Sequence, residues 1–257
     1  MPSDDHRAMA DLEVSDLEVA PPAVVRQAAR DFAAALAETP QFRAFEQAAE
    51  RLRHDEAAQH AIAAYQDKQA ALRVMLMLNA VSAEDQAELE RLREAFLSNP
   101  SVVAYLQAQA DLTAICQAAG QAAVGKEELQ MRTPPITLPA NLLAATMALG
   151  ETLSYAEPIV VYHRAQERLN HNPQAQALLR GIAEAQANLR SQQMSNSVRP
   201  TDLESLRNLQ RQVQANRTIT DYLEAQQEAI LYLREVNQHI SQLLGIDFGA
   251  LLGAGSC

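Results

Sequence analysis

Residues 48–109 of this sequence return at residues 165–226, with a constant offset of 117 positions. About 22 positions carry the same residue in both copies, among them Tyr105 with Tyr222 and Gln109 with Gln226. An offset that never slips over such a length indicates a duplicated structural unit rather than a shared bias in composition. The duplication therefore predicts two homologous units in the 257 residues.

The composition favours helices. The chain is 48% hydrophobic, much of it Ala, with 4% aromatic residues, no Trp and 8 Gly. Ala, Leu, Gln, Glu and Arg are strong helix formers, and runs of β-branched residues are missing from the sequence. We therefore predict an all-α fold of two homologous helical-bundle units in tandem, with about four helices each and long, heptad-like final helices.

Charge and hydropathy exclude several classes of protein. The net charge of −11 and the pI near 5.0 predict a surface that repels phosphate backbones, so we expect no direct nucleic-acid contact. No apolar run is long enough to span a membrane, and the acidic start lacks the basic and apolar regions of a signal peptide. These features predict a cytoplasmic protein without membrane contact.

Capping residues predict where helices begin. Thr39 precedes a proline and is a predicted N-cap. Asp55 and Asn172 share one position of the repeat and are good N-caps, so the chain either breaks there or kinks. Thr201 followed by Glu204 has the spacing of a capping box. The apolar stretch 75–77 is predicted to lie in the core.

The last helix of each unit shows the most regular pattern. In the second unit apolar residues recur every three or four positions from Tyr222 to Leu243, and Tyr105 begins the same phase in the first. Gln109 and Gln226 interrupt these apolar seams. A polar seam residue can fix register or partner choice, and a half-exposed Gln at the edge of a bundle is the equal alternative.

The duplication also suggests that the two units pack into one pseudo-twofold body. In that arrangement Phe42 with Phe45, and Ile62 with Tyr65, would bury their side chains against the other unit. The predicted organisation has five parts: an acidic disordered tail (1–20), the first helical unit (21–125), a Pro-rich linker (126–140), the second helical unit (141–245), and a Gly-rich tail ending in Cys257, disordered or loosely docked (246–257).

Several segments resemble the YlbF/YmcA family of small bacterial helical regulators. The likeness is strongest over residues 23–125, and the second unit follows it more loosely, with Arg217 where the family has a proline. The segments that carry it are Ala28–Phe32, Ala35–Pro40, Phe42–Ala49, Asp55–Ala57, Asn99–Val102 and Tyr105–Ala108. The family usually has one unit per chain, so its stoichiometry does not transfer to a duplicated chain.

The resemblance implies a non-enzymatic regulator or scaffold. Such proteins assemble with one another and with further partners, and they affect competence, sporulation, biofilm formation and RNA processing through an endoribonuclease. We therefore expect protein partners, through self-association or with other YlbF/YmcA-like proteins, and no small-molecule substrate is identified. Family members with a cysteine-bearing, glycine-rich C-terminus are linked to iron–sulfur binding, and residues 253–257 look like a reduced version of it.

Cys257 is therefore the one candidate cofactor ligand, and an iron–sulfur cluster would need further ligands from other chains. This gives the alternative function, an iron–sulfur or redox sensor subunit. Cys116 falls on an apolar helix face and is expected in the core. His54 and His171 repeat, and either a helix terminus or a site explains them. Phosphate loops, nucleophile elbows and zinc-protease motifs are missing from the sequence, so we expect no enzyme.

Overall fold

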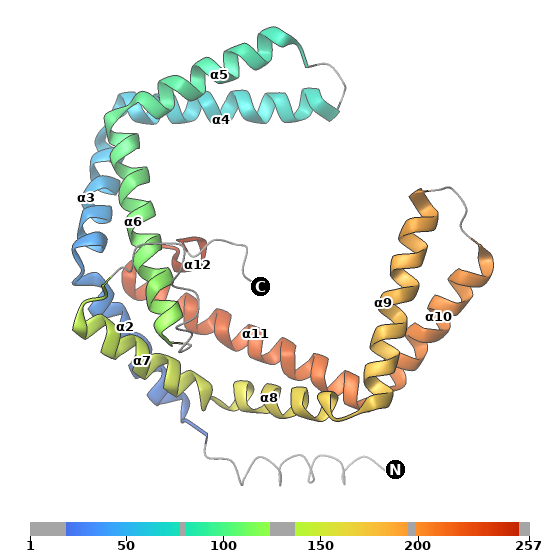
Figure 1. Ribbon diagram of the computed structural model, residues 1–257. Coiled ribbons are helices and arrows are strands. Elements are labelled where there is room, and N and C mark those ends of the chain that lie inside the picture. The colour runs from blue at the N-terminus through green and yellow to red at the C-terminus, as the bar shows by residue number, and fades with distance from the viewer. Residues whose placement is uncertain (1–18, 78–80, 124–136, 195–198, 252–257) are drawn as a thin grey trace, which may run out of the picture. The chain divides into compact units, whose positions relative to one another are not determined.

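The computed structural model describes residues 19–77, 81–123, 137–194 and 199–251. These residues form helices and short connections, and within them the one β-type contact is an isolated bridge between Ala20 and Ala156 (Figure 1). The predicted all-α fold is therefore confirmed. The acidic tail, most of the linker and the end of the C-terminal tail with Cys257 lie outside the described residues.

Each repeat contains five helices. Those of the first repeat are α2 (Pro22–Ala37), α3 (Pro40–His54), α4 (Glu56–Met77), α5 (Ala83–Ser98) and α6 (Pro100–Ala123). The second repeat has α7 (Ala140–Ser154), α8 (Glu157–Asn170), α9 (Pro173–Met194), α10 (Pro200–Ala215) and α11 (Arg217–Leu244), and α12 (Phe248–Leu251) follows. Five helices replace the expected four because the chain breaks, rather than kinks, after α3 and after α8.

The two breaks are built in the same way. The Asp55 backbone is extended, and its Oδ1 accepts a hydrogen bond from the Ala58 backbone N–H at 2.9 Å. In the second repeat Asn172 Oδ1 accepts from the Ala175 N–H at 3.0 Å. Both side chains therefore cap the next helix, as the sequence predicts, because an N-cap oxygen satisfies a backbone donor that has no partner within the helix.

Each capping side chain also reaches the final helix of its repeat. The Ser101 hydroxyl at the start of α6 donates to Asp55 Oδ2 at 2.6 Å. At the same offset, Asn172 Nδ2 donates to the Thr218 hydroxyl of α11 at 3.0 Å. One pair is charged and the other is neutral, so the duplication has kept the geometry of this contact while its chemistry has changed.

The predicted capping box at Thr201 is wrong. Pro200 is the first residue of α10, so Thr201 lies inside the first turn and Arg199 occupies the cap without a side-chain hydrogen bond. The capping box lies instead in the first repeat, where Ser82 and Asp85 exchange hydrogen bonds at the start of α5. The proline displaced the cap by two residues.

The chain divides into two compact units, and each contains segments of both repeats. One unit comprises residues 29–149 and 240–251, and the other comprises residues 19–28 and 150–239 of the described chain. The division falls within α2, α7 and α11. In the first of these units α3 lies beside α6, and α4 and α5 form an antiparallel hairpin (Figure 1). In the second, α9 and α10 form the equivalent hairpin.

The last described residues, 245–251, pack against the first repeat. Gly245 ends α11 with a φ of +67°, a conformation that glycine adopts without strain. Phe248 and Leu251 of α12 are buried, and the Phe248 ring meets the edge of Phe32 of α2 at 5.9 Å. The Thr113 hydroxyl of α6 donates to the Leu251 carbonyl at 3.3 Å. The first six residues of the predicted loose tail therefore belong to the packed structure.

Val25, Ala28, Phe32 and Leu36 recur every three or four positions and form the buried face of α2. The predicted seam of α11 is right at Ala229 and Ile240, which are buried. It is wrong at Leu233 and Leu243, which are exposed, whereas Leu244 is buried. The stretch 75–77 is not core, because Leu76 and Met77 are 65% and 79% exposed.

Thr39 provides a test of the capping scheme. Its buried hydroxyl accepts from the Phe42 N–H at 3.2 Å and donates to the Leu36 carbonyl at 2.7 Å, which joins α2 to α3. We expect Thr39→Ala to lower the free energy of unfolding by about 1–2 kcal/mol in urea titrations followed by circular dichroism. Thr39→Ser keeps the hydroxyl and should lose less. Equal losses in the two variants would contradict the assignment.

The α4–α5 hairpin predicts a pH dependence. Hydrogen bonds from the Ser82 hydroxyl, the Lys68 ammonium and the Ser82 N–H lower the pKa of Asp85 to about 2. A carboxyl whose pKa is lower in the folded state stabilises the fold above its unfolded pKa near 3.8, and this contribution disappears as the pH falls toward 2.

We therefore expect Asp85→Asn to lower the melting temperature at pH 6, and the difference from wild type to shrink between pH 4 and pH 2. Asp202→Asn is the matched control, because Asp202 occupies the same position of the repeat and accepts from the neutral Gln192 at 2.9 Å. A difference that is independent of pH for Asp85→Asn would refute the charge assignment.

Candidate functional site

The first repeat contains a partly open cavity of about 270 Å³ where α3, α4, α5 and α6 meet. We call it the elbow hollow. Seven apolar or aromatic side chains and two amides line it, and none of the nine is charged. They are Leu52, Ile62, Tyr65, Gln66, Gln69, Phe96, Val102, Tyr105 and Leu106.

Two aromatic contacts fix the walls of the elbow hollow. Tyr65 of α4 stacks on Phe96 of α5, with ring centroids 5.6 Å apart and planes 7° from parallel. Tyr105 of α6 packs against Phe45 of α3 at 5.4 Å. Each pair joins two helices, so the rings are held from both sides and cannot collapse easily into the cavity.

The frame beneath these walls is the hydrogen-bonded break between α3 and α4. Hydrogen bonds from the Ser101 hydroxyl and the Ala58 N–H lower the pKa of the Asp55 carboxyl, which keeps it ionised at neutral pH. Asn99 Oδ1 caps α6 by accepting from the N–H groups of Ser101 and Val102. The starts of α4 and α6 are therefore tied together, and Val102, almost fully buried, lies between them and the cavity.

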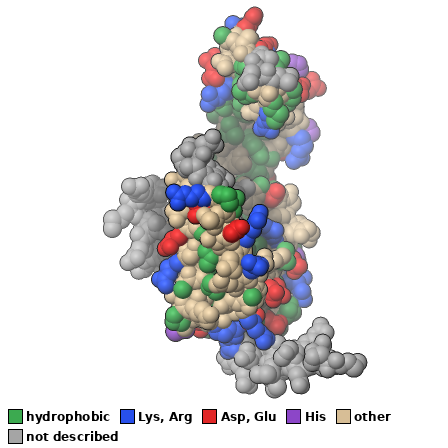
Figure 2. Space-filling view, turned by 90° about the vertical axis from the view of Figure 1, so that its right-hand side faces the viewer, with side chains coloured by type: hydrophobic (Ala, Val, Ile, Leu, Met, Phe, Trp, Pro, Cys, Tyr) green, Lys and Arg blue, Asp and Glu red, His purple; other side chains and the backbone are tan. Residues whose placement is uncertain are grey.

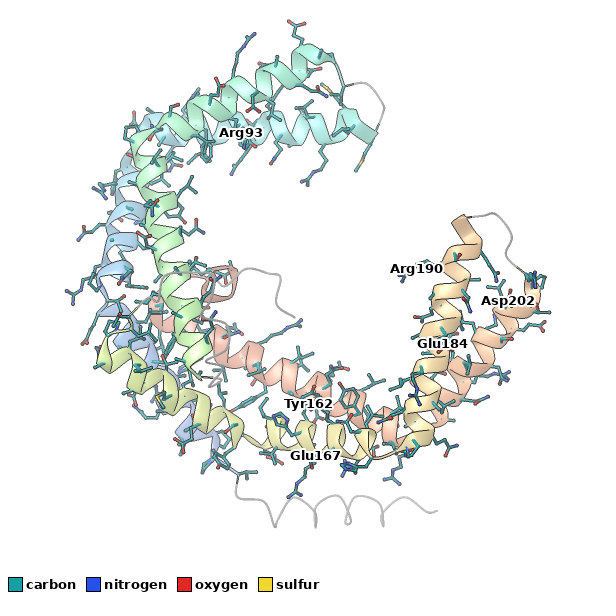
Figure 3. The ribbon with its side chains drawn as sticks, in the orientation of Figure 1. Arg93, Tyr162, Glu167, Glu184, Arg190 and Asp202 are labelled. Atoms are coloured by element: carbon teal, nitrogen blue, oxygen red, sulfur yellow. The ribbon has the colours of Figure 1, made fainter. Side chains whose placement is uncertain are left out.

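The corresponding side chains of the second repeat form an apolar cluster. Leu169, Ala175 and Ile219 form a buried cluster there, covered by Leu178, Leu179, Val213 and Tyr222. The aromatic contact between the second and the last helix of the repeat is also present, since the ring centroids of Tyr162 of α8 and Tyr222 of α11 are 5.7 Å apart. Figure 3 labels Tyr162 on α8. The hydrogen bond between the two hydroxyls, and then burial, raise the pKa of Tyr222.

A second feature of the first repeat is the apolar end of α4. Val74, Leu76 and Met77, which we call the α4 tip, are 59%, 65% and 79% exposed. The hairpin that carries them is held by ion pairs from Lys68 of α4 to Asp85 and Glu88 of α5. The hydrogen bonds to Glu88 and then to Asp85 raise the pKa of Lys68.

The residues predicted to mediate packing are not all in one place. Ile62, Tyr65 and Tyr105 line the elbow hollow, whereas Phe42 and Phe45 are buried beside it in α3. Phe45 and Tyr65 have aromatic partners within the first repeat. The burial of these residues against the other unit stays a prediction.

The seam glutamines and the members of the hollow that the sequence missed are also placed. Gln109 and Gln226 are half-buried, and the Gln226 amide is 3.5 Å from the Tyr222 hydroxyl. Sequence reasoning missed Gln66, Phe96 and Leu106 as neighbours in the hollow. A weak signal existed for Gln69 alone, because it repeats as Gln186.

Cys116, His54 and His171 lie where the structural interpretation of each residue places it, in the core or at the end of a helix. Cys116 is 3% exposed, and burial raises the pKa of its thiol to about 12, so it behaves as a small core residue. His54 ends α3 beside Glu50, and His171 follows α8 with Nδ1 2.8 Å from the Glu167 carbonyl oxygen. The iron–sulfur role of Cys257 stays a prediction, because that residue lies outside the described part.

The acidic side chains of the second repeat are spread over several helices. Figure 3 shows Glu167, Glu184 and Asp202 on three different helices, α8, α9 and α10. Among the residues that the structure describes, no three His, Cys, Asp or Glu side chains are placed to hold a metal ion together. A search of those same residues finds no helix with the length and apolarity needed to cross a membrane.

Comparison with known proteins gives one decisive match. The sequence model of the family described as "Control of competence regulator ComK, YlbF/YmcA" matches residues 25–122 and again residues 142–244. The chain belongs to this family. No curated protein and no solved structure matches it.

The two matches agree with the tandem duplication and confirm the resemblance of the sequence to YlbF/YmcA proteins. The first match begins at Val25 in α2 and ends in α6, and the second begins at Leu142 in α7 and ends with α11. Each YlbF/YmcA region therefore contains the aromatic contact and the capping bridge described above, and α12 is additional to both.

The buried thiol gives a direct prediction. In a Cys257→Ser variant, Cys116 is the sole remaining cysteine, and we expect it not to react with a thiol reagent at pH 8 while the protein is folded. Reaction should appear only in denaturant. The labelling reaction is monitored by absorbance. Rapid labelling of the folded variant would show that α6 opens or that Cys116 is not buried.

Proposed function

We propose that this protein is a non-enzymatic regulator or scaffold that acts through helix-mediated contacts with other proteins. The observation that carries the proposal is the match of both repeats to a family of competence regulators. By the same membership we propose a role in competence, sporulation, biofilm formation or RNA processing. The proposal retains the cytoplasmic location that the sequence predicts.

The α4 tip supports contact with a protein partner. Three adjoining apolar side chains, each more than half exposed, are costly in water and are typical of surfaces that another molecule covers. In the second repeat the matching positions of Val74 and Leu76 hold Ser191 and Gln193, and Met77 is matched by Met194. The second repeat therefore keeps one of these three apolar residues, and the difference suggests that the two repeats have different partners.

The remaining surface is compatible with such a role. Acidic, basic and apolar side chains are interspersed over the face shown in Figure 2. With a net charge of −11, a partner protein is favoured over a phosphate backbone. We propose another YlbF/YmcA-like protein, or a further copy of this one, as the partner class.

The proposal is tested by affinity purification of the tagged full-length chain from its native host, with mass spectrometry of the proteins that accompany it. We expect a defined set of partners with the wild type. The double variant Leu76→Ser, Met77→Ser should recover at least one of them several-fold less, because it removes apolar area from the interface.

The matched control is Leu231→Ser with Leu233→Ser, two exposed leucines on α11 in the second repeat. It also replaces two exposed apolar side chains with serine, although these are 49% and 39% exposed against 65% and 79% for Leu76 and Met77, and it should leave the recovery of that partner unchanged. Recovery of no protein above an untagged host, or an equal loss with both double variants, would count against the proposal.

A further inference from the structure

We propose that the elbow hollow is a binding site for a small, neutral molecule that contains one or two fused rings. This inference goes beyond the proposed function, which concerns protein partners, and it would make the first repeat sensitive to a metabolite. It rests on the volume of the hollow, the chemistry of its lining and its contrast with the second repeat.

The volume sets the size of the ligand. The cavity holds about 270 Å³. An apolar protein cavity of about 150 Å³ accepts a single benzene ring, so the elbow hollow has room for a ligand on the order of ten non-hydrogen atoms. Its volume is smaller than that of most sites for drug-sized molecules, which limits the ligand to a compact ring system.

The lining sets the chemical class. Stacked Tyr65 and Phe96 present aromatic surface, and Ile62 and Leu106 add aliphatic surface, so a ring gains dispersion and apolar burial. No lining side chain is charged, and a charged ligand would therefore lose hydration without gaining an ionic partner. The amide of Gln69 can satisfy one polar group on an otherwise apolar molecule.

The second repeat lines the corresponding region with different side chains. It has the same aromatic contact between α8 and α11 and the same capping bridge as the first repeat. However, Ile182 and Val213 stand at the positions of Tyr65 and Phe96, so the stacked aromatic pair belongs to the first repeat. A frame shared by both repeats that carries stacked rings beside a cavity in one of them points to a use for that cavity.

The position of the hollow suggests what binding would do. The ligand would touch α3, α4, α5 and α6 together, at the place where the α4–α5 hairpin joins the α3–α6 pair. Binding to the folded state alone would stabilise that junction in proportion to ligand concentration. The orientation of the α4 tip would then depend on whether the site is filled.

Indole is a suitable probe, because it is neutral, has nine non-hydrogen atoms and carries one N–H donor. The protein holds no Trp, so indole fluorescence can be followed without a tryptophan background. Titration of the full-length chain should show saturable binding, with a dissociation constant roughly between micromolar and low millimolar for a ligand of this size. The melting temperature should rise with indole concentration.

The decisive variant is Leu106→Phe, which places a larger side chain at the rim of the hollow. It should weaken indole binding by roughly fivefold or more, because the added ring takes up part of the cavity. Leu223→Phe changes the equivalent exposed leucine of the second repeat and should leave binding unchanged. If circular dichroism shows that Leu106→Phe is unfolded, Ile62→Phe with its counterpart Leu179→Phe replaces the pair.

Three outcomes would overturn the proposal. They are the failure of indole to bind saturably, an equal effect of the two matched variants, and binding of indole-3-acetate as tight as that of indole. If indole does not bind saturably, the side chain of a protein partner becomes the alternative occupant of the elbow hollow. None of them bears on the affinity purification, so the failure of this inference and that of the proposed function can be told apart.

Discussion

The structure of each repeat depends on one side chain that makes two hydrogen-bonding contacts. Asp55, and Asn172 at the equivalent position, cap the helix that follows a break and also hydrogen-bond to the first turn of the repeat's last helix. Without that second contact the break would be a flexible joint. With it, the direction of the α4–α5 or α9–α10 hairpin is set relative to α6 or α11, and the aromatic contact between the outer helices can form.

Much of this arrangement could be predicted from the sequence, because capping is local. An Asp, Asn or Thr before a helical pattern supplies an oxygen to a donor three residues away, and nothing distant is needed. This is why the sequence places Thr39, Asp55 and Asn172 correctly. The error at Thr201 is local too, since Pro200 can itself begin the helix and so moves the cap back to Arg199.

The burial of individual side chains could be predicted less well, because it depends on which other helices pack against them. The stretch 75–77 is as apolar as a core segment, but α4 extends past its packing partners and leaves Met77 exposed. The seam of α11 is predicted correctly at Ile240 but not at Leu233 and Leu243, because spacings of three and four fit two adjacent faces of the same helix. The elbow hollow could not be predicted at all, since its lining comes from four helices and only the fold brings Leu52, Phe96 and Leu106 together.

The docking of α12 has a consequence for the history of the chain. Phe248 lies in α12, after the end of the second repeat, and supplies the aromatic partner of Phe32 in the first repeat, while the Thr113 hydroxyl donates to the Leu251 carbonyl. A gene cut back to its first half would encode a protein with this apolar patch uncovered. Once such a cover had evolved, the fused gene could no longer be divided into two independent copies without a loss of stability, so the fusion would tend to persist in its descendants.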